Sequence, residues 1–281
     1  MPELPEVQTI VNDLSRTVVG KRIESVQVFR DAIVQLDPER FVNRLTDTVI
    51  RAVYRRGKYI VFELSGPLWM VVHLRMTGKF SVQPSPAPVH IHNRVIFQLG
   101  DRQDMIFNDL RCFGTIDLTE KIDKYPALSQ LGLDPWDHRL TAPGLYKVLQ
   151  HRTANIKSLL LNQTIIAGLG NIYVSEILFD ACIHPDTKGY QLSKKQVAQL
   201  LRSTRTILSD ALTFNGTSIS DYRRVDDKQG TFQNFLKVYG KAGSPCHRCA
   251  STIQKIKQNQ RSTFYCSQCQ QKKRSFKRLP A

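Results

Sequence analysis

Long hydrophobic runs are missing from this chain of 281 residues. No stretch approaches the roughly 18 consecutive apolar residues of a membrane-spanning helix, which argues against a membrane protein. The first residues, MPELPEVQTI, lack a basic segment followed by an apolar one, so we expect no secretory signal and a cytoplasmic location. A hydrophobic content of 41% is ordinary for a folded protein, and the length suggests about two domains.

Cysteine is also scarce, and four of the six cysteines form two CxxC pairs. Their spacing is Cys246-x2-Cys249-x16-Cys266-x2-Cys269, in which each pair forms a tight thiolate turn. Four thiolates complete a tetrahedral site with no open position, so the sequence predicts one structural Zn²⁺. A redox role for the pairs is the alternative. The other two cysteines are interpreted as ordinary thiols.

Acidic residues are absent from the last part of the chain. Residues 241–281 contain ten Lys and Arg and no Asp or Glu, and the whole chain has a formal net charge of +16. Such an excess favours a polyanionic partner, because each neutralised phosphate releases a counterion. Lys255, Lys257 and Arg261 lie between the CxxC pairs, where we expect them to face outward from a β-hairpin. A solubilising tail is the alternative, but it would need no metal site.

Hydrophobic periodicity predicts a helix over residues 4–20, directly after Pro2 and Glu3. Short β-branched and aromatic segments then predict the strands of a sandwich or barrel. These strands are expected at 23–29, 48–54, 59–64, 68–74, 93–99 and 114–118. The segment 83–89 has three prolines and is expected to be a loop.

A helical period follows from residue 143 to 215. Ser193 and Gln196 predict a capping box at the start of its longest helix. Within the segment IAGLGNIY, a glycine turn leads into a helix at Asn171, whose first N–H groups suit a phosphate. A plain turn is the alternative, and Lys157 upstream favours the phosphate interpretation. Residues 215–234 predict a long polar loop.

The N-terminal pair is the best candidate for catalysis. Removal of Met1 would give Pro2 a free secondary amine, and an α-amine titrates near ~7.7–8 against ~10.4 for Lys. Such an amine can attack an aldehyde-like sugar carbon and form an iminium that acts as an electron sink. Glu3 would serve as the general acid or base beside it. A frayed chain end without function is the alternative.

Six motifs occur in a fixed order along the chain. They are MPELPEV at the start, RRGKY at 55–59, HLRMTGKF at 73–80, DLRCFG at 109–114, AGLGNIYVSEILF at 167–179, and the cysteine ribbon with QRSTFYC at 260–266. Together they resemble the bacterial formamidopyrimidine-DNA glycosylase family over nearly the whole chain.

The resemblance implies an α+β fold with three parts. An N-terminal helix and an antiparallel β-sandwich would form a catalytic domain over 1–131. A helix–two-turns–helix domain with a lesion-capping loop would follow over 132–235. A four-cysteine zinc-finger hairpin and a basic tail would complete the chain over 236–281.

The resemblance also implies catalytic roles. Pro2 would form a Schiff base at the sugar C1′, and Glu3 would assist base loss and sugar ring opening. Lys58 would help base excision and β-elimination. Arg261 of the finger would bind phosphate and assist δ-elimination.

Further positions match DNA contacts of the family. Met76, Arg111 and Phe113 would fill the gap left by the everted base and face the orphaned cytosine. The backbone would be contacted by His73, His90, Arg152, Lys157 and Asn171. The segment around 217–224 would close over the damaged base. Cys112 stands where relatives often carry a basic residue, and Asn162 replaces a common Asp.

The implied protein is a monomeric base-excision-repair enzyme of the bacterial nucleoid, with no membrane partner. It would be a bifunctional glycosylase and AP lyase that flips 8-oxoguanine and formamidopyrimidines out of duplex DNA. The sister group, endonuclease VIII, prefers oxidised pyrimidines and typically begins PEGPE, whereas Leu4 and the set of Met76, Arg111 and Phe113 here favour the purine enzyme. A non-catalytic zinc-ribbon protein that binds nucleic acid explains the charge and cysteines, but not the N-terminal pair.

Overall fold

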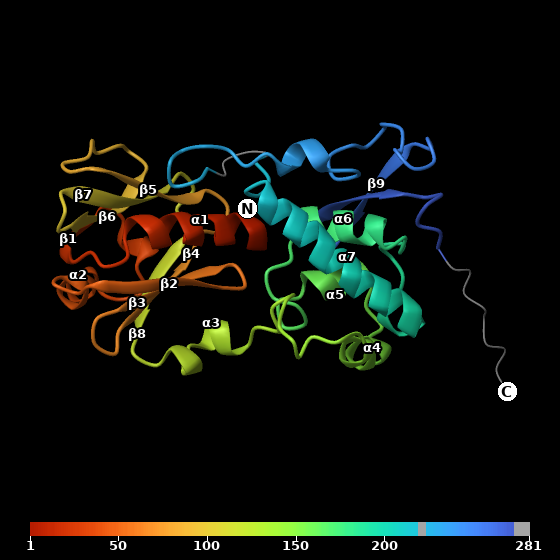
Figure 1. Ribbon diagram of the computed structural model, residues 1–281, viewed down its shortest axis with the longest axis horizontal. Helices are drawn as coiled ribbons and strands as arrows, with labels where there is room; N and C mark the ends of the chain where they lie inside the picture. The colour runs from red at the N-terminus through yellow and green to blue at the C-terminus, as the bar shows by residue number, and fades with distance from the viewer. Residues whose placement is uncertain (219–222, 273–281) are drawn as a thin grey trace. The chain divides into compact units, whose positions relative to one another are not determined.

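A computed structural model describes residues 1–218 and 223–272, which form two compact units (Figure 1). Residues 1–131 and 210–234 belong to the first unit, and the second comprises 132–209 and the chain from 235 onward. Part of the expected lesion-capping segment and most of the basic tail lie outside the described residues. No helix in the described part of the chain is long and apolar enough to cross a membrane.

The first unit contains two antiparallel sheets of four strands each. One sheet has the order β1 (Ile23–Val28), β6 (Asn93–Leu99), β7 (Gln103–Asp109) and β5 (Gly78–Pro84). The other has the order β2 (Ile50–Arg56), β3 (Tyr59–Leu64), β4 (Trp69–His73) and β8 (Thr115–Thr119). Apolar side chains from both sheets meet in one buried core, which confirms the predicted sandwich.

Two strands and a helix were not predicted from the sequence. Strand β5 begins at Gly78 and ends at Pro84, in the segment expected to be a loop. A proline is tolerated there because β5 is an edge strand, where a missing N–H breaks no inner ladder. Strand β7 pairs with both β5 and β6. The helix α2 (Pro38–Leu45) is capped by Asp37, which accepts from the Arg40 N–H at 3.0 Å.

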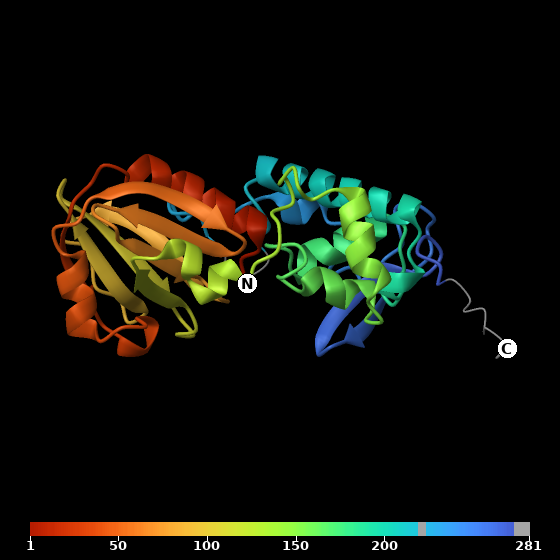
Figure 2. The same ribbon diagram turned by 90° about the horizontal axis from the view of Figure 1, so that it is seen from below.

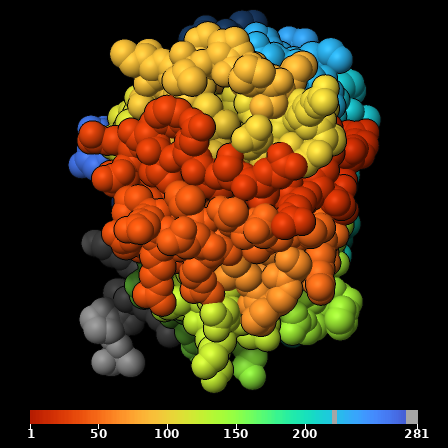
Figure 3. All heavy atoms as spheres, turned by 90° about the vertical axis from the view of Figure 1, so that its left-hand side faces the viewer, coloured from red at the N-terminus to blue at the C-terminus, as the bar shows by residue number. Residues whose placement is uncertain are grey.

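Helix α1 (Leu4–Thr17) packs its apolar face into the sandwich core. It ends at Thr17 rather than at Gly20, because the chain turns at Val18 before it enters β1. Ser15 Oγ donates to the Val53 carbonyl at 3.3 Å and ties α1 to β2. Figure 2 shows α1 along the sandwich, and Figure 3 shows one end of this unit, with the early chain in red and orange. The first residues are therefore held by a helix whose burial is extensive.

The second unit is helical and carries a hairpin near the C-terminus. Its helices are α4 (Ala142–Gln150), α5 (Ile156–Leu161), α6 (Asn171–Asp180) and most of α7 (Lys194–Thr213). The predicted capping box is confirmed, since Ser193 N–H donates to Gln196 Oε1 and Gln196 N–H donates to Ser193 Oγ. Short helical segments occur in the first unit at Asp31–Ile33, Ile122–Lys124 and Pro126–Ser129 (α3), in the second at Gly189–Gln191, and at the boundary of the two at Phe232–Phe235.

The hairpin of β9 (Ile253–Gln258) and β10 (Arg261–Cys266) packs against α6. The buried Glu176 carboxylate of α6 accepts three backbone N–H groups from residues 237–239, at 2.8 to 3.0 Å. Arg248 donates to the Phe179 carbonyl at 2.9 Å, and its guanidinium lies 4.5 Å from the Phe179 ring centroid. The predicted α+β class with sandwich, helical part and four-cysteine hairpin is thus confirmed.

Candidate functional site

The N-terminal pair is held in place rather than frayed. Glu3 is the N-cap of α1 and is only 3% exposed, and Pro2 is buried next to it. The Glu3 N–H donates to Glu6 Oε2 at 2.8 Å, and the other oxygen of Glu6 accepts from the Thr217 N–H at 2.7 Å. One carboxylate therefore fixes both the start of α1 and the chain at Thr217. Such a fixed position is what an N-terminal nucleophile needs.

Lys58 and Gly57 form the turn of the β2–β3 hairpin, in which Gly57 has a positive φ of 58°. Arg55 fastens this turn to α1, because it donates to Gln8 Oε1 at 2.9 Å and to the Gly57 carbonyl at 3.2 Å. The Lys58 side chain is mostly buried, with 6% exposure. The hairpin thus brings a shielded cation to the unit that carries the N-terminal pair.

His73 lies opposite Tyr59 in the next strand pair, with ring centroids 4.6 Å apart. Its Nδ1 accepts from the Arg75 N–H at 2.9 Å. Burial, together with the nearby charges of Arg75 and Lys58, lowers the pKa of His73 to about 3. The imidazole is therefore neutral at neutral pH, with its Nε2 as the donor.

This histidine makes stability depend on pH. The pKa of His73 is about 3 in the folded protein and near 6.5 when unfolded, so its stabilising effect is complete above pH 6.5 and falls as pH drops toward 3. We expect a loss of about 2 kcal/mol between pH 6.5 and 5 from this group. Urea unfolding of the free protein at both pH values measures it. In His73→Gln, the loss of unfolding free energy between these two pH values should be smaller by that amount. An unchanged loss would contradict the assignment.

Met76, Arg111 and Phe113 are brought together on one surface of the first unit. Arg111 Nη1 lies 3.1 Å from Met76 Sδ, and its guanidinium lies 4.8 Å from the Phe113 ring centroid. Met76 is 41% exposed and Phe113 is 52% exposed, although both are large and apolar. An exposed cluster of this kind marks a binding surface rather than core.

Asp109 holds the turn that presents Arg111 and Phe113, and the sequence analysis gave it no role. Its carboxylate is fully buried and accepts the Thr77 hydroxyl, the Arg111 N–H at 3.2 Å and the Gly114 N–H at 2.7 Å. Cys112 within this turn has a positive φ of 53°. Strained turns of this kind often occur at functional sites. The only sequence feature that could have indicated this role is the position of Asp109 at the start of the DLRCFG motif.

In the second unit, Asn171 and Lys157 converge on the finger hairpin. Asn171 begins α6, and its Nδ2 donates to the Ser262 carbonyl at 3.1 Å. Lys157 Nζ donates to the same carbonyl at 2.8 Å and to Thr263 Oγ1 at 2.5 Å. Arg261, the residue before Ser262, is exposed, as are Lys255 and Lys257. The helical part and the finger therefore present one joint surface.

Lys157 was predicted from the sequence to contact the DNA backbone, and this contact stays a prediction. In the structure its side chain is 1% exposed, and its ammonium donates hydrogen bonds to the hairpin. An ammonium buried against a carbonyl and a hydroxyl serves the packing of α5 on β10. Its effect on a phosphate would be indirect, through the position of Arg261 and Ser262.

Replacing Lys157 by Met should therefore loosen the hairpin. The change removes the ammonium donor from Ser262 and Thr263, and the loss of such a hydrogen bond is worth about 1–3 kcal/mol. We expect amide hydrogen exchange along β10 to accelerate about tenfold or more. Lys257→Met, which changes an exposed lysine of the same hairpin, is the control and should leave exchange unchanged. Equal protection in both variants would contradict this role for Lys157.

His90 and Arg152 are exposed but join neither cluster. His90 lies in the loop before β6, and Arg152 follows α4. The catalytic candidates are divided between the two units. Pro2, Glu3 and Lys58 belong to the first unit, and Arg261 belongs to the second.

The four cysteines of the CxxC pairs form one cluster. Their Sγ atoms all lie within 4.8 Å of one another, with Cys246 and Cys269 at 3.9 Å and Cys249 and Cys266 at 3.4 Å. Tetrahedral thiolates around Zn²⁺ stand about 3.8 Å apart, given Zn–S bonds near 2.3 Å. The donor set therefore fits one structural zinc, and it leaves no position for a substrate.

Three domain families match the chain. They are the formamidopyrimidine-DNA glycosylase N-terminal domain over residues 1–116, the formamidopyrimidine-DNA glycosylase H2TH domain over 131–223, and the zinc finger found in FPG and IleRS over 243–272.

Relatives match along their whole length. The formamidopyrimidine-DNA glycosylase of Exiguobacterium sp. is 41% identical over 276 residues, which is 97% of this chain and 100% of the relative. That of Rickettsia conorii is 40% identical over 275 residues, covering 96% and 99%. The Lactococcus lactis Fpg bound to DNA with an abasic site superposes with a TM-score of 0.91 at 37% identity, covering 96% and 100%. A Lactococcus lactis FPG mutant bound to DNA containing Fapy-dG gives a TM-score of 0.92, at the same identity and coverage.

The sandwich, the helix–two-turns–helix part and the four-cysteine finger define a class of DNA repair glycosylases that carry a zinc finger. Within that class, this chain belongs to the formamidopyrimidine-DNA glycosylase family.

Proposed function

We propose that the chain excises oxidised purines, namely 8-oxoguanine and formamidopyrimidines, from duplex DNA and then cleaves the abasic site. The observation that carries this proposal is the buried, fixed pair of Pro2 and Glu3 at the start of α1. Relatives in this family are formamidopyrimidine-DNA glycosylases, and solved ones are complexes with DNA that contains Fapy-dG or an abasic site. The protein would act as a monomer on chromosomal DNA in the bacterial nucleoid.

The proposed reaction begins once Met1 is removed. The Pro2 nitrogen attacks C1′ of the everted nucleotide, the glycosidic bond breaks, and the base leaves with a proton. Glu3 donates a proton to the sugar ring oxygen as the ring opens, which leaves an iminium between Pro2 and C1′. Loss of a C2′ proton then expels the 3′ phosphate, and a second elimination expels the 5′ phosphate. Water finally releases the sugar fragment from Pro2.

The other candidate residues would support this reaction. Lys58 lies in the same unit as the N-terminal pair, and its charge would stabilise the phosphate that leaves in β-elimination. Arg261 would bind a phosphate from the finger and assist δ-elimination. Met76, Arg111 and Phe113 would occupy the space of the everted base, as their exposed cluster supports.

An incision assay tests the proposed function. The substrate is a duplex oligonucleotide with one 8-oxoguanine opposite cytosine, and the ends of the products are identified by mass spectrometry. We expect a one-nucleotide gap with phosphate at both ends, as β,δ-elimination requires. Binding of the duplex without incision would instead identify a non-catalytic DNA-binding protein. Faster incision at an oxidised pyrimidine would contradict the purine assignment.

Glu3→Gln should separate binding from chemistry. The amide keeps the size of the side chain but cannot donate or accept the catalytic proton, so base excision should fall about a hundredfold or more. Duplex affinity, measured by gel shift, should stay within about twofold. Single-turnover excision on the same duplex gives the rate. Excision at the wild-type rate would remove Glu3 from its assigned role.

A further inference from the structure

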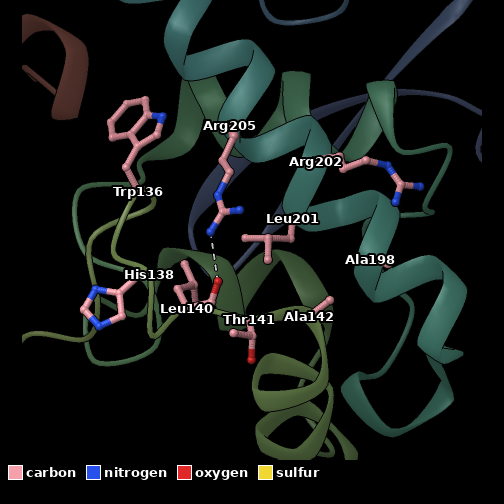
Figure 4. Close-up of a pocket in the computed structure, with 9 residues that line it drawn as sticks. All are labelled: Trp136, His138, Leu140, Thr141, Ala142, Ala198, Leu201, Arg202 and Arg205. Carbon is pink, nitrogen blue, oxygen red and sulfur yellow. Dashed lines mark hydrogen bonds between the residues drawn. The ribbon is translucent and has the colours of Figure 1, made fainter.

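Two adjoining hollows lie on the second unit between α4 and α7, and Figure 4 shows the residues that line the first of them. Their volumes are about 530 and 620 Å³, and they share Ala142 of α4 and Ala198 of α7. Trp136 and Leu201 line the first hollow, and Tyr146 lines the second. The small alanines leave room between the helices, while the larger side chains give the hollows an apolar lining.

The first hollow has a fixed wall. Arg205 of α7 donates from Nε to the Pro135 carbonyl and from Nη2 to the Leu140 carbonyl, both at 2.9 Å. Figure 4 shows the second of these bonds, between Arg205 and Leu140. Thr141 Oγ1 then caps α4 by accepting from the Gly144 N–H at 3.2 Å. The hollow is therefore preformed, which lowers the entropic cost of filling it.

The rim of the hollows is positively charged. Lys147, Lys194 and Arg202 line them and are exposed, and neither hollow is lined by Asp or Glu. Lys194 Nζ lies 5.9 Å from the Tyr146 ring centroid, so its charge stands beside an aromatic wall. Lys194 is also the first residue of α7, whose N-terminal dipole adds positive potential there.

We propose that this surface, the α4–α7 groove, binds an acidic peptide segment of a partner protein. A bulky apolar side chain of the peptide would fill the hollow beside Trp136, and its carboxylates would face Lys194 and Arg202. Duplex DNA would satisfy the charges, but its backbone has no apolar group to fill the hollows. None of the residues assigned to catalysis, DNA or zinc lines the groove.

The test uses a fluorescein-labelled peptide of twelve residues built from Asp, Leu and Phe, with the full zinc-loaded protein. Fluorescence anisotropy should show saturable binding at micromolar concentrations. Lys194→Glu reverses a rim charge, and Ala198→Glu places a carboxylate at the floor shared by both hollows. Each should weaken peptide binding about fivefold or more.

The neighbouring Lys195 provides the matched control. It is equally exposed on α7 but lines neither hollow, so Lys195→Glu should leave peptide affinity unchanged. A peptide with Lys in place of Asp should not bind.

The groove assignment is overturned if the acidic peptide does not bind, or if all three variants bind it alike. It is also overturned if Lys194→Glu weakens binding of undamaged duplex but not of peptide, because the groove would then be a DNA surface. Lesion incision without peptide should be unchanged in every variant, so this test stands apart from that of the enzyme.

Discussion

Replacing Pro2 by Gly is expected to abolish covalent trapping of the protein on lesion DNA by borohydride. Borohydride reduces the iminium between the N-terminal nitrogen and C1′ to a stable amine bond. A secondary amine forms a cationic iminium directly, whereas the primary amine of glycine forms a neutral imine that must gain a proton. Glycine also removes the ring that fixes φ ahead of α1. We expect trapping and excision to fall roughly a thousandfold or more, as for the loss of other nucleophiles.

Pro5 offers the control for this change. It lies in the first turn of α1 but has no free amine in the processed chain, so Pro5→Gly should still be trapped. A form that retains Met1 should not be trapped, because its Pro2 nitrogen lies in a peptide bond. If Pro2→Gly is trapped as well as the wild type, another amine is the nucleophile. Lys58 would then be the next candidate, because it is a shielded amine in the same unit.

Replacing Cys266 by Ser should remove the zinc and with it the finger. Cys266 is fully buried, and its neighbours in the small core are Phe179, Ile253 and Phe264. A structural zinc of this type supplies about 10–16 kcal/mol of folding free energy, far more than so small a core can provide. The hairpin between the CxxC pairs carries Arg261 and Ser262, so its loss should remove the phosphate contacts assigned to the finger.

The measurements are zinc content by native mass spectrometry and duplex affinity by gel shift. Cys266→Ser should bind less than one zinc per chain, and its affinity for duplex should fall about a hundredfold. Cys182→Ser is the matched control, because Cys182 is exposed and lies outside the four-cysteine cluster. One zinc retained with full affinity would show that the fourth thiolate is dispensable.

The zinc site was predictable because its ligands are close in sequence. Two residues between paired cysteines set the local turn, so the spacing alone gave all four ligands. The start of α1 and the hairpin of Lys58 were predictable for the same reason. In each case the local structure is formed by a short stretch of chain, and the residues that determine it lie in that same stretch.

Other features of the protein arise from contacts between residues that are distant in the chain and could not be predicted. Lys157 lies 105 positions before Ser262, and only the docking of the finger on α5 and α6 showed that its charge is buried. Asp109 and Thr77 meet across the β5–β7 pairing, and β5 itself was hidden by its glycine and proline. The local chemistry of the N-terminus and the zinc ligands follows from neighbouring residues in the chain. The packing of separate elements decided which cations face solvent and which hold the fold, because burial is a property of the whole chain.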